Sequence, residues 1–523
     1  MTSGPSAGRW ARAAAVVVGA ALYALALPPW DVECLAWLAL VPLLLVARVL
    51  PARRAFAYGV VYGCACPWAI GPWLAPAMAS YFALGLPLGV AAASLYALVF
   101  WGTTFGVFAA GAALLLRAER RLSARLLVPA LWVATEWLRA RVLGQPWGLL
   151  GYTQWMHTAL IQVAALTAVY GVSFLVAFVN TAITEAIVLV AARARARQVL
   201  ATLALPLALL APVWAAGALV AERGPSGGFN AHSVAVVQAN LPPAFEWTRS
   251  YTDREVMTHI QATERLPVRP GPALIVWPEH AVPRYLEDEL MLTAQLAALA
   301  TRHGADLLFG APRHEAGRTY NSLRLITAAG HDGGHYDKQR LVLGAERNPL
   351  ASSAPGEADE SPRQFSPGSG PGVLESFLPL GVSICHEILF PELVSRSVAA
   401  GAELLVNVSN DGWLDGGGGV ASRQHFAMAV FRAVETRRYL VRAATTGVSG
   451  VVDPYGRVVT TLAPGATGVL DVSVAGRSAL TPYVRLGDVF AFACVLAAAA
   501  ALHGRRTAVL RPYPRLVSAP RVQ

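Results

Sequence analysis

The stretch Leu380-Gly-Val-Ser-Ile-Cys385-His386-Glu387 places a thiol directly after a short aliphatic run. A run of this length between turn signals predicts a buried β-strand. A thiol at the sharp turn after a strand occupies the position that exposes a nucleophile. Cys385 is therefore either a reactive thiol or a buried and inert one.

Cys385 is also the only cysteine in the polar part of the chain, so no disulfide partner is evident for it. The other four cysteines lie in or beside apolar runs: Cys34, Cys64, Cys66 and Cys494.

A carboxylate follows a second apolar run, Ala273-Leu-Ile-Val-Trp277-Pro278-Glu279. Partial desolvation at the end of a buried strand would raise the pKa of Glu279 toward that of a useful general base. The alternative is a surface glutamate in a turn.

Lys338 is the single lysine of the chain, since the other 41 of its 42 lysine and arginine residues are arginine. An ammonium is a compact point donor whose proton affinity responds to burial, which distinguishes it from a guanidinium. The next residues, Leu341-Val-Leu-Gly-Ala-Glu346, supply another carboxylate.

Glu279, Lys338 and Cys385 together are the residue types that an activated-thiol site needs. Glu279 would take the thiol proton, Cys385 would attack an acyl carbon, and Lys338 would donate to the oxyanion.

Histidines offer an alternative, a Cys–His dyad. His386 is adjacent to the thiol, and neighbouring side chains normally point apart, whereas His425 falls on a predicted helix. His331 and His335 flank a Gly-rich turn without further ligands, so we expect neither a zinc site nor a cofactor.

The segment from Arg223 to Arg485 has ordinary polar content and alternates strands with helices. This alternation predicts a layered α/β domain. Predicted strands include 233–237, 273–277, 306–309, 322–327, 380–384 and 403–408, and predicted helices include 290–303 and 424–438. Residues 351–372 are rich in Ser, Pro, Gly and acidic side chains and predict a flexible surface loop.

The chain as a whole is too apolar for a soluble protein, and its apolar runs lie outside the polar segment. The composition is 55% hydrophobic and 14% charged, with a mean hydropathy of +0.47, whereas a globule needs charge to cover its surface. Eight runs could each cross a bilayer, which needs about 20 helical residues. They are 11–27, 35–50, 55–74, 82–116, 126–139, 160–191, 199–220 and 489–502.

Arginine placement orients these runs. Every second connection is basic, so the positive-inside rule predicts eight spans with both termini cytoplasmic. Arg139 and Arg141 would lie on the extracytoplasmic side in this scheme, where the rule expects few positive charges. They are interpreted as snorkelling from the end of the fifth span. The expected parts are a membrane domain of seven spans (1–222), an extracytoplasmic catalytic domain (223–484), and an eighth span with a basic tail (485–523).

Two further expectations concern cleavage of the first apolar run and binding of nucleic acid. The first run imitates a cleavable secretory signal, but its removal would spoil the alternation of charge. Most of the net charge of +10 lies in short loops that would face anionic lipid headgroups, so no nucleic-acid partner is predicted.

Three motifs resemble those of the nitrilase (carbon-nitrogen hydrolase) superfamily: Trp277-Pro-Glu279, Tyr336-Asp-Lys338-Gln-Arg-Leu and Ser383-Ile-Cys385-His-Glu387. With the predicted spans, the chain resembles the apolipoprotein N-acyltransferase family over almost its whole length. Further matches are Val237-Gln-Ala-Asn240 with Trp247, Tyr320-Asn-Ser322, Asn407-Val-Ser-Asn410-Asp-Gly-Trp413, Gln424-His425, the stretch from Arg442 to Gly450, and Thr481-Pro-Tyr483.

The resemblance implies a nitrilase-like αββα sandwich on a multi-pass membrane bundle in the inner membrane of a bacterium. It also implies a ping-pong reaction, in which Cys385 takes the sn-1 acyl chain of a phospholipid as a thioester. The α-amine of a diacylglyceryl-cysteine at the N-terminus of an apolipoprotein then accepts the chain. A site that faces the bilayer would keep hydrolytic water scarce.

Other residues take roles from the same resemblance. Glu346 and Glu387 match family carboxylates that would position the lysine and the nucleophile loop. Trp247, Asn410 and Trp413 would lie on the substrate side. For the oligomeric state we expect a monomer.

The chain departs from the family pattern near the nucleophile. His386 stands where the family commonly has tyrosine, which would change hydrogen bonding and allow a pH dependence through histidine. Leu343-Gly344-Ala345 replaces the usual Pro-Phe-Gly. The Gly-rich stretch 414–422 predicts a mobile loop near the lipid entrance.

Two other functions remain as alternatives. A membrane-anchored amidase or nitrilase would use the same triad but pass the acyl group to water. A transporter would need polar residues through the spans, and apart from Glu136, Gln162 and Asn180 there are few.

Overall fold

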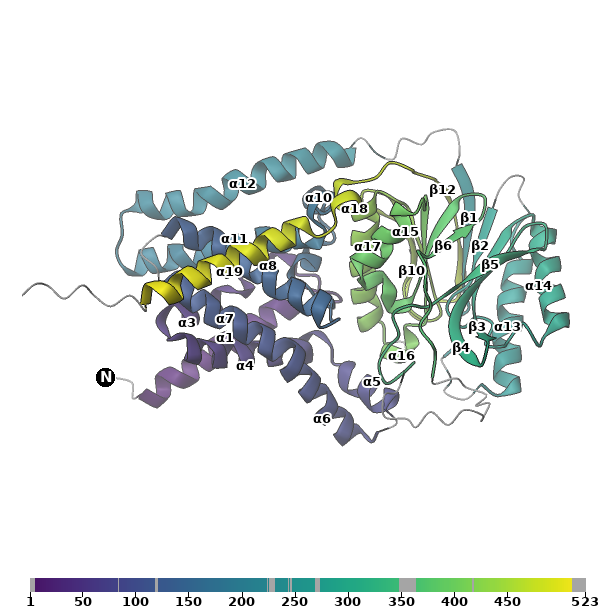
Figure 1. Cartoon of the computed structure of the whole chain (residues 1–523), viewed down its shortest axis with the longest axis horizontal. Coiled ribbons are helices and arrows are strands. Elements are labelled where there is room, and N and C mark those ends of the chain that lie inside the picture. Colours follow the sequence, from purple (N-terminus) through teal and green to yellow (C-terminus); the bar gives the residue numbers. More distant parts are fainter. Residues whose placement is uncertain are drawn as a thin grey trace, which may run out of the picture.

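The computed structural model describes residues 5–82, 84–117, 121–222, 224, 231–242, 244, 247–268, 273–347, 364–415 and 418–509. Figure 1 shows long helices packed side by side in one half and a domain of two sheets in the other. Most of the loop expected at 351–372 lies outside the described residues.

The helical half contains every apolar run that the sequence indicates. Its helices are α1 (Pro5–Leu25), α2 (Ala36–Ala39), α3 (Val41–Val49), α4 (Ala52–Ile70), α5 (Leu74–Tyr81), α6 (Leu86–Tyr96), α7 (Thr103–Leu116), α8 (Arg121–Trp137), α9 (Thr158–Ile161), α10 (Ala164–Thr167), α11 (Val169–Ala191), α12 (Ala196–Glu222) and α19 (Val489–Val509), with helical turns at Glu33–Leu35, Ala97–Gly102, Leu138–Val142 and Leu150–Gln154.

Three helical stretches in the described part of the chain are long and apolar enough to cross a membrane: Leu86–Leu116, Val169–Ala191 and Ala196–Glu222. The expected eight spans are therefore not confirmed. Two of the apolar runs are interrupted. Run 35–50 divides at Leu40 between α2 and α3, and run 160–191 divides at Ala168, which has a positive φ of 53°.

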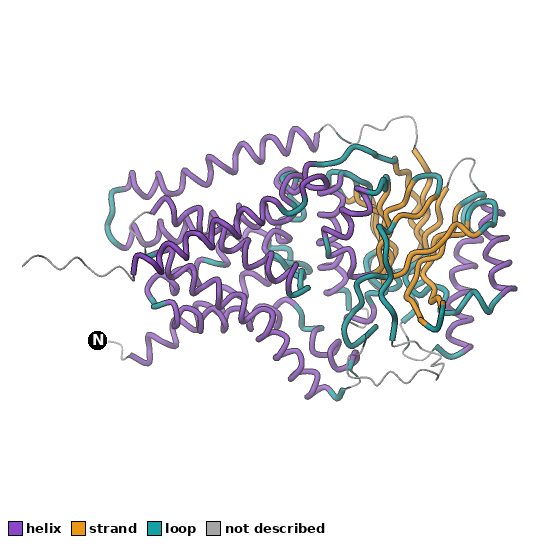
Figure 2. Tube along the Cα trace, viewed as in Figure 1, coloured by secondary structure: helices purple, strands orange, loops and turns teal. Residues whose placement is uncertain are grey.

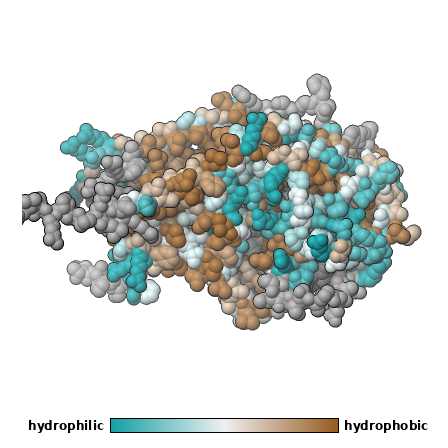
Figure 3. Space-filling model, viewed as in Figure 1, coloured by the Kyte–Doolittle hydropathy of each residue, from teal (hydrophilic) through white to brown (hydrophobic). Residues whose placement is uncertain are grey.

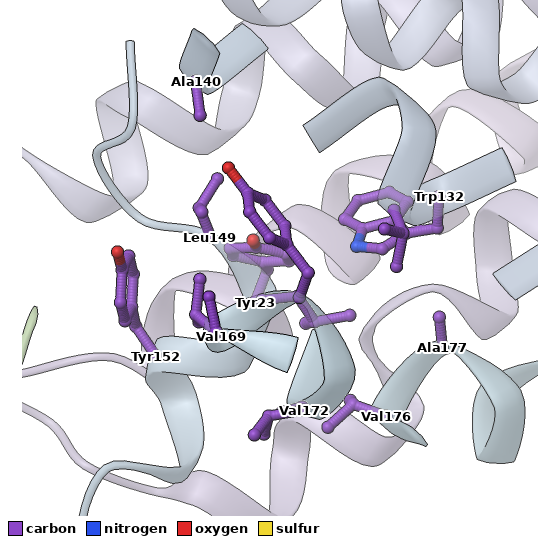
Figure 4. Close-up of a cluster of buried hydrophobic side chains, with 14 of the residues drawn as sticks. Tyr23, Trp132, Ala140, Leu149, Tyr152, Val169, Val172, Val176 and Ala177 are labelled. Carbon is purple, nitrogen blue, oxygen red and sulfur yellow. The ribbon is translucent and has the colours of Figure 1, made fainter. Parts of the chain in front are cut away.

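Aromatic and β-branched side chains fill the centre of the helical half. Figure 4 shows Tyr23 and Trp132 beside Val169, Val172 and Val176 of α11. The Tyr23 hydroxyl donates a 2.8 Å hydrogen bond to the carbonyl of Gly148, so the buried phenol is satisfied. Figure 3 shows hydrophobic residues over the helices and polar residues over the sheet domain on the visible face, as expected for a bilayer around the helices.

The interpretation of Arg139 and Arg141 as snorkelling residues is wrong. Arg139 is 1% exposed, and its guanidinium lies 4.1 Å from the ring centroid of Trp101. Arg141 forms ion pairs with Glu392 and, at 2.7 Å, with Asp488. Both guanidinium groups therefore have protein partners.

The sheet domain follows the expected alternation. Its elements are β1 (Ala231–Gln238), α13 (Arg249–Glu264), β2 (Ala273–Val276), α14 (Leu290–His303), β3 (Asp306–Glu315), β4 (Arg318–Ile326), β5 (Asp332–Asp337), β6 (Val373–Glu375), β7 (Pro379–Ile384), a 3-10 helix η5 (Cys385–Leu389), α15 (Pro391–Ala399), β8 (Leu404–Ser409), α16 (Gly412–Asp415), α17 (Val420–Thr436), β9 (Leu440–Ala444), β10 (Ser449–Val452), β11 (Val458–Leu462), β12 (Gly468–Ala475) and α18 (Pro482–Leu486). Every strand and helix named from the sequence is confirmed.

These elements form four layers. Among the described residues, one sheet has the order β12-β1-β2-β3-β4-β5 and the other β11-β10-β9-β8-β7-β6. Figures 1 and 2 show α13 and α14 outside the first sheet, and α15 and α17 between the second sheet and the helical half. The inner faces of both sheets share one apolar core that includes Val234, Val276, Val382 and Val406. The predicted αββα arrangement is confirmed.

The layout brings strand ends together. Strands β1, β2 and β3 run parallel, as do β7, β8 and β9. Ligands of sheets with helical layers bind beyond the carboxyl ends of such strands. Glu279, Cys385 and Asn410 follow the carboxyl ends of β2, β7 and β8, so these three side chains belong to one region.

Candidate active site

Cys385 sits at a strained turn. Strand β7 ends at Ile384, and Cys385, the first residue of η5, has a positive φ of 53°. A non-glycine residue in this region costs energy and is typical of functional sites. The side-chain amide of Asn407 donates to the Cys385 carbonyl at 3.2 Å and thereby supports the turn. The sharp turn expected from the sequence is confirmed.

Glu387 joins the nucleophile turn to the segment that follows Lys338. Its two carboxylate oxygens accept backbone N–H groups from Ile384 at 2.8 Å, from Gln339 at 2.7 Å and from Arg340 at 3.0 Å. The Tyr336 hydroxyl donates to the same carboxylate at 3.0 Å. Burial raises the pKa of Glu387, and the backbone donors oppose that rise.

Lys338 lies between two carboxylates. Its Nζ is 3.0 Å from Glu279 Oε1 and 2.7 Å from Glu346 Oε1, with 1% of the side chain exposed. The Asn321 amide donates to the same two residues at 2.8 and 2.7 Å. The backbone N–H of Asn410 donates to Glu279 Oε2 at 2.8 Å, so both oxygens of that carboxylate are held.

The backbone of Glu279 rests directly on strand β3. A Cβ at Gly310 would lie 2.7 Å from the Cα of Glu279 and 2.6 Å from the nitrogen of His280. Only glycine permits this approach, which fixes where the carboxylate leaves the sheet.

Charge pairing reverses the expected pKa shift of Glu279. Burial alone would raise the pKa, but the Lys338 ammonium, His280 and two hydrogen bonds together lower it below the usual glutamate value. The pKa of Lys338 lies well above its usual value, because Glu279 and Glu346 outweigh burial. Burial, followed by the charge of Glu279, raises the pKa of the Cys385 thiol. The resting cluster is a protonated thiol beside an ionised carboxylate and an ammonium.

A cavity of about 760 Å³ opens onto this cluster. Glu279, Lys338 and Cys385 line it together. The helical half supplies mainly apolar and aromatic walls from α5, α6 and the segments around them, among them Met78, Tyr81, Tyr96, Phe100, Trp101 and Trp147. The polar chemistry therefore lies at the sheet domain, and the space for an apolar substrate lies against the helices.

The predicted site residues other than Glu387 lie at the same cavity. Trp247, Asn410, Trp413 and His386 all line it, and Trp247 packs edge-on against His280 with ring centroids 5.3 Å apart. Asn410 contributes its backbone N–H to Glu279, a contact that the sequence did not indicate.

No hydrogen bond between described residues joins either histidine of the alternative dyad to Cys385. His386 lines the cavity, and burial and the nearby Lys338 hold its pKa well below the usual value, which makes its imidazole a weak base. His425 is buried on α17, and its Nδ1 lies 3.0 Å from Asp411 Oδ1. Among the described residues, no group of three or more His, Cys, Asp or Glu side chains could hold a metal ion.

Sequence reasoning missed two residues of the cluster. Asn321 bridges the carboxylates, and Tyr336 anchors Glu387. Both belong to segments that carried the family resemblance, but a motif match alone assigns no contact. The loop expected to be mobile, 414–422, is described except for residues 416 and 417, and its mobility stays a prediction.

Residues 233–483 match the sequence profile of the carbon-nitrogen hydrolases. The two-sheet fold and this match define the sheet domain as a carbon-nitrogen hydrolase domain, and hence the chain as an enzyme of that class. Residues 19–182 match the profile of the apolipoprotein N-acyltransferase N-terminal domain. The chain belongs to the apolipoprotein N-acyltransferase family.

Relatives of this family match most of the chain. The apolipoprotein N-acyltransferase of Geobacter metallireducens is 36% identical over 506 residues, which cover 94% of this chain and 95% of the relative. That of Brucella melitensis is 33% identical and covers 88% of this chain and 89% of its own length. Together with the apolar helices, these matches identify a membrane-associated protein.

Two solved structures are similar to about half of the chain. A nitrilase-superfamily protein of Saccharomyces cerevisiae is 19% identical with a TM-score of 0.35, covering 55% of this chain and 96% of its own. An amidase from Nesterenkonia sp. AN1, solved with acrylamide, is 20% identical with a TM-score of 0.34, covering 48% and 92%.

Proposed function

We propose that the chain transfers the sn-1 acyl chain of a phospholipid, through a thioester on Cys385, to the α-amine of an N-terminal diacylglyceryl-cysteine of apolipoproteins. The observation that carries this proposal is the shared cavity. Cys385, Glu279 and Lys338 lie at the end of a space whose other walls are the apolar side chains of the helical half. Such a space suits an acyl chain whose ester reaches the thiol.

The acylation step uses the resting charges of the cluster. Cys385 Sγ attacks the sn-1 ester carbon while Glu279 takes the thiol proton, and Lys338 donates to the oxyanion. The carbon–oxygen bond then breaks, and Glu279 returns the proton to the glycerol oxygen. The products are a lysophospholipid and the Cys385 thioester.

The transfer step repeats the same proton path. The neutral α-amine attacks the thioester carbon, and Glu279 takes the proton that the nitrogen loses. The carbon–sulfur bond breaks, and the thiolate regains this proton, which leaves an amide and the free thiol. Apolar walls keep water scarce, so the thioester survives until the amine arrives.

The proposal includes a placement in the inner membrane. Residues 1–222 form the membrane domain, 223–484 the catalytic domain on the extracytoplasmic side, and 485–523 the last span and tail. The start of α1 and the end of α19 both point away from the sheet domain (Figure 1), which supports two cytoplasmic termini. A monomer suffices, because one chain supplies every group that the reaction uses.

The test is mass spectrometry of the purified protein after incubation with a phospholipid labelled in its sn-1 chain. A hydroxylamine-labile acyl group on Cys385 that moves to a diacylglyceryl-cysteine peptide supports the transferase. Label that is recovered only as free fatty acid would instead support the hydrolase alternative. An unmodified Cys385 with no label released from the phospholipid would contradict both.

A further inference from the structure

Arg340 is a guanidinium at the wall of the cavity that the acylation chemistry leaves unused. It is the only arginine among the described cavity-lining residues, and half of its side chain is exposed. Lys338, the other basic side chain there, is held between two carboxylates. Arg340 is therefore the cation that can still serve a bound anion.

The partners of Arg340 in the described part of the chain leave most of its donors available. Its guanidinium carbon lies 5.1 Å from the ring centroid of Phe390, a cation–π contact that uses no N–H. Its ion pair with Glu392 is long, at 3.5 Å, and Glu392 also pairs with Arg141. A guanidinium has five N–H donors, and two of them can bind a phosphate side by side.

The backbone fixes the position of Arg340 relative to the nucleophile. Glu387 Oε1 accepts the Arg340 N–H at 3.0 Å, and Glu387 Oε2 accepts the N–H of Ile384, the residue before Cys385, at 2.8 Å. One buried carboxylate thus separates the two chain segments. The Arg340 backbone is therefore held one carboxylate away from the nucleophile turn, and its side chain lines the same cavity as Cys385.

This arrangement matches the shape of the proposed donor. A glycerophospholipid carries its phosphate at the opposite end of the glycerol from the sn-1 ester. A group that binds the phosphate must therefore lie near the nucleophile but not beside it. The phosphate is also the one anionic group that all common glycerophospholipids share.

We propose that Arg340 binds the phosphodiester of the donor phospholipid while its sn-1 ester lies at Cys385. This inference rests on the proposed function and adds the source of donor selectivity. The enzyme selects a lipid with a phosphate over a neutral lipid with the same acyl chains, whatever alcohol the phosphate carries. Bidentate pairing requires arginine, so lysine replaces it only in part.

The test compares two donors with the same acyl chains, one of which lacks the phosphate and the alcohol that it carries. Full-length protein in detergent micelles is mixed with a labelled phospholipid or with the diacylglycerol of identical chains, and formation of the Cys385 thioester is timed. We expect wild type to favour the phospholipid by about tenfold to a hundredfold, the range of a charge-assisted hydrogen bond. Arg340→Gln should bring the ratio close to one, and Arg340→Lys should give an intermediate value.

Arg318→Gln is the matched control, because it removes an exposed arginine of the same domain at the start of β4. The control should keep the wild-type ratio. An unchanged ratio in Arg340→Gln, or equal losses with both donors, would overturn the assignment. Inhibition of wild type by inorganic phosphate with either donor would indicate a free-anion site and would also overturn it. If wild type forms no thioester with either donor, the proposed function itself fails.

Discussion

Replacing Lys338 with arginine keeps the buried charge but changes its geometry. The ammonium contacts Glu279 at 3.0 Å and Glu346 at 2.7 Å with 1% exposure, so a larger guanidinium cannot keep both contacts without displacing a carboxylate. Overpacking of this kind costs about 1–3 kcal/mol of the free energy of unfolding. Loss of a point donor to the oxyanion costs about 10²- to 10³-fold in rate. We therefore expect Lys338→Arg to fold with reduced stability and to acylate at least about a hundredfold more slowly.

Lys338→Met separates charge from geometry. It fits the space but leaves two buried carboxylates facing each other, and an unpaired buried charge costs about 3–5 kcal/mol. The pKa of Glu279 would rise, because the ammonium that lowers it is gone. We expect the methionine variant to be inactive and less stable than the arginine variant.

The assay for both variants combines two measurements in detergent. Intact mass records the rate of thioester formation on Cys385, and thermal unfolding records stability. If Lys338→Arg acylates at close to the wild-type rate, the argument for a point donor is refuted. If Lys338→Met is the more stable variant, the ion pairs do not support the fold.

Cys385→Ser should form no hydroxylamine-labile adduct while unfolding within about 1 kcal/mol of wild type, because the substitution is nearly isosteric; a labile adduct elsewhere would contradict the assigned nucleophile. Glu387→Gln should slow acylation and lower the free energy of unfolding by about 1–3 kcal/mol, because a neutral amide cannot accept all four hydrogen bonds that the carboxylate accepts. An unchanged acylation rate would show that these hydrogen bonds do not support the reaction. The lowered pKa of Glu279 contributes stability that is present above the unfolded value of about 4.3 and is lost as pH falls through the folded pKa. Acylation activity after brief acid exposure should therefore persist below pH ~4.3. A loss of acylation activity that begins near pH ~6 would contradict this. Hydrogen exchange should find 414–422 less protected than strand β8, and equal protection would end the idea of a mobile loop.

The strands that the sequence indicated are those with an apolar run between turn signals. Strand β5, Asp332-Gly-Gly-His-Tyr-Asp337, has no such run and was missed. Its pairing with β4 supplies the backbone partners that make it a strand. Tertiary pairing thus overrides a local pattern that favours a turn.

Site residues could be named from the sequence, but their electrostatics could not. Local reasoning placed Glu279 at the end of a buried strand and so predicted a raised pKa. The ammonium that reverses the shift comes from Lys338, 59 residues further along the chain. Charge pairing across such a separation depends on the fold, and no local pattern records it.

The cavity could not be inferred from either half of the chain alone, because it exists only where the halves meet. Gln424 on α17 shows how they are joined. Its amide donates to the carbonyls of Pro28 at 2.8 Å and Ile70 at 2.7 Å, and its oxygen accepts the Trp147 indole N–H at 3.0 Å. Ile70 and Trp147 also line the cavity, so the same contacts that join the halves shape its wall. In the proposed reaction the helices therefore form part of the substrate site: the sheet domain would supply the thiol chemistry, and the apolar helical wall would receive the acyl chain.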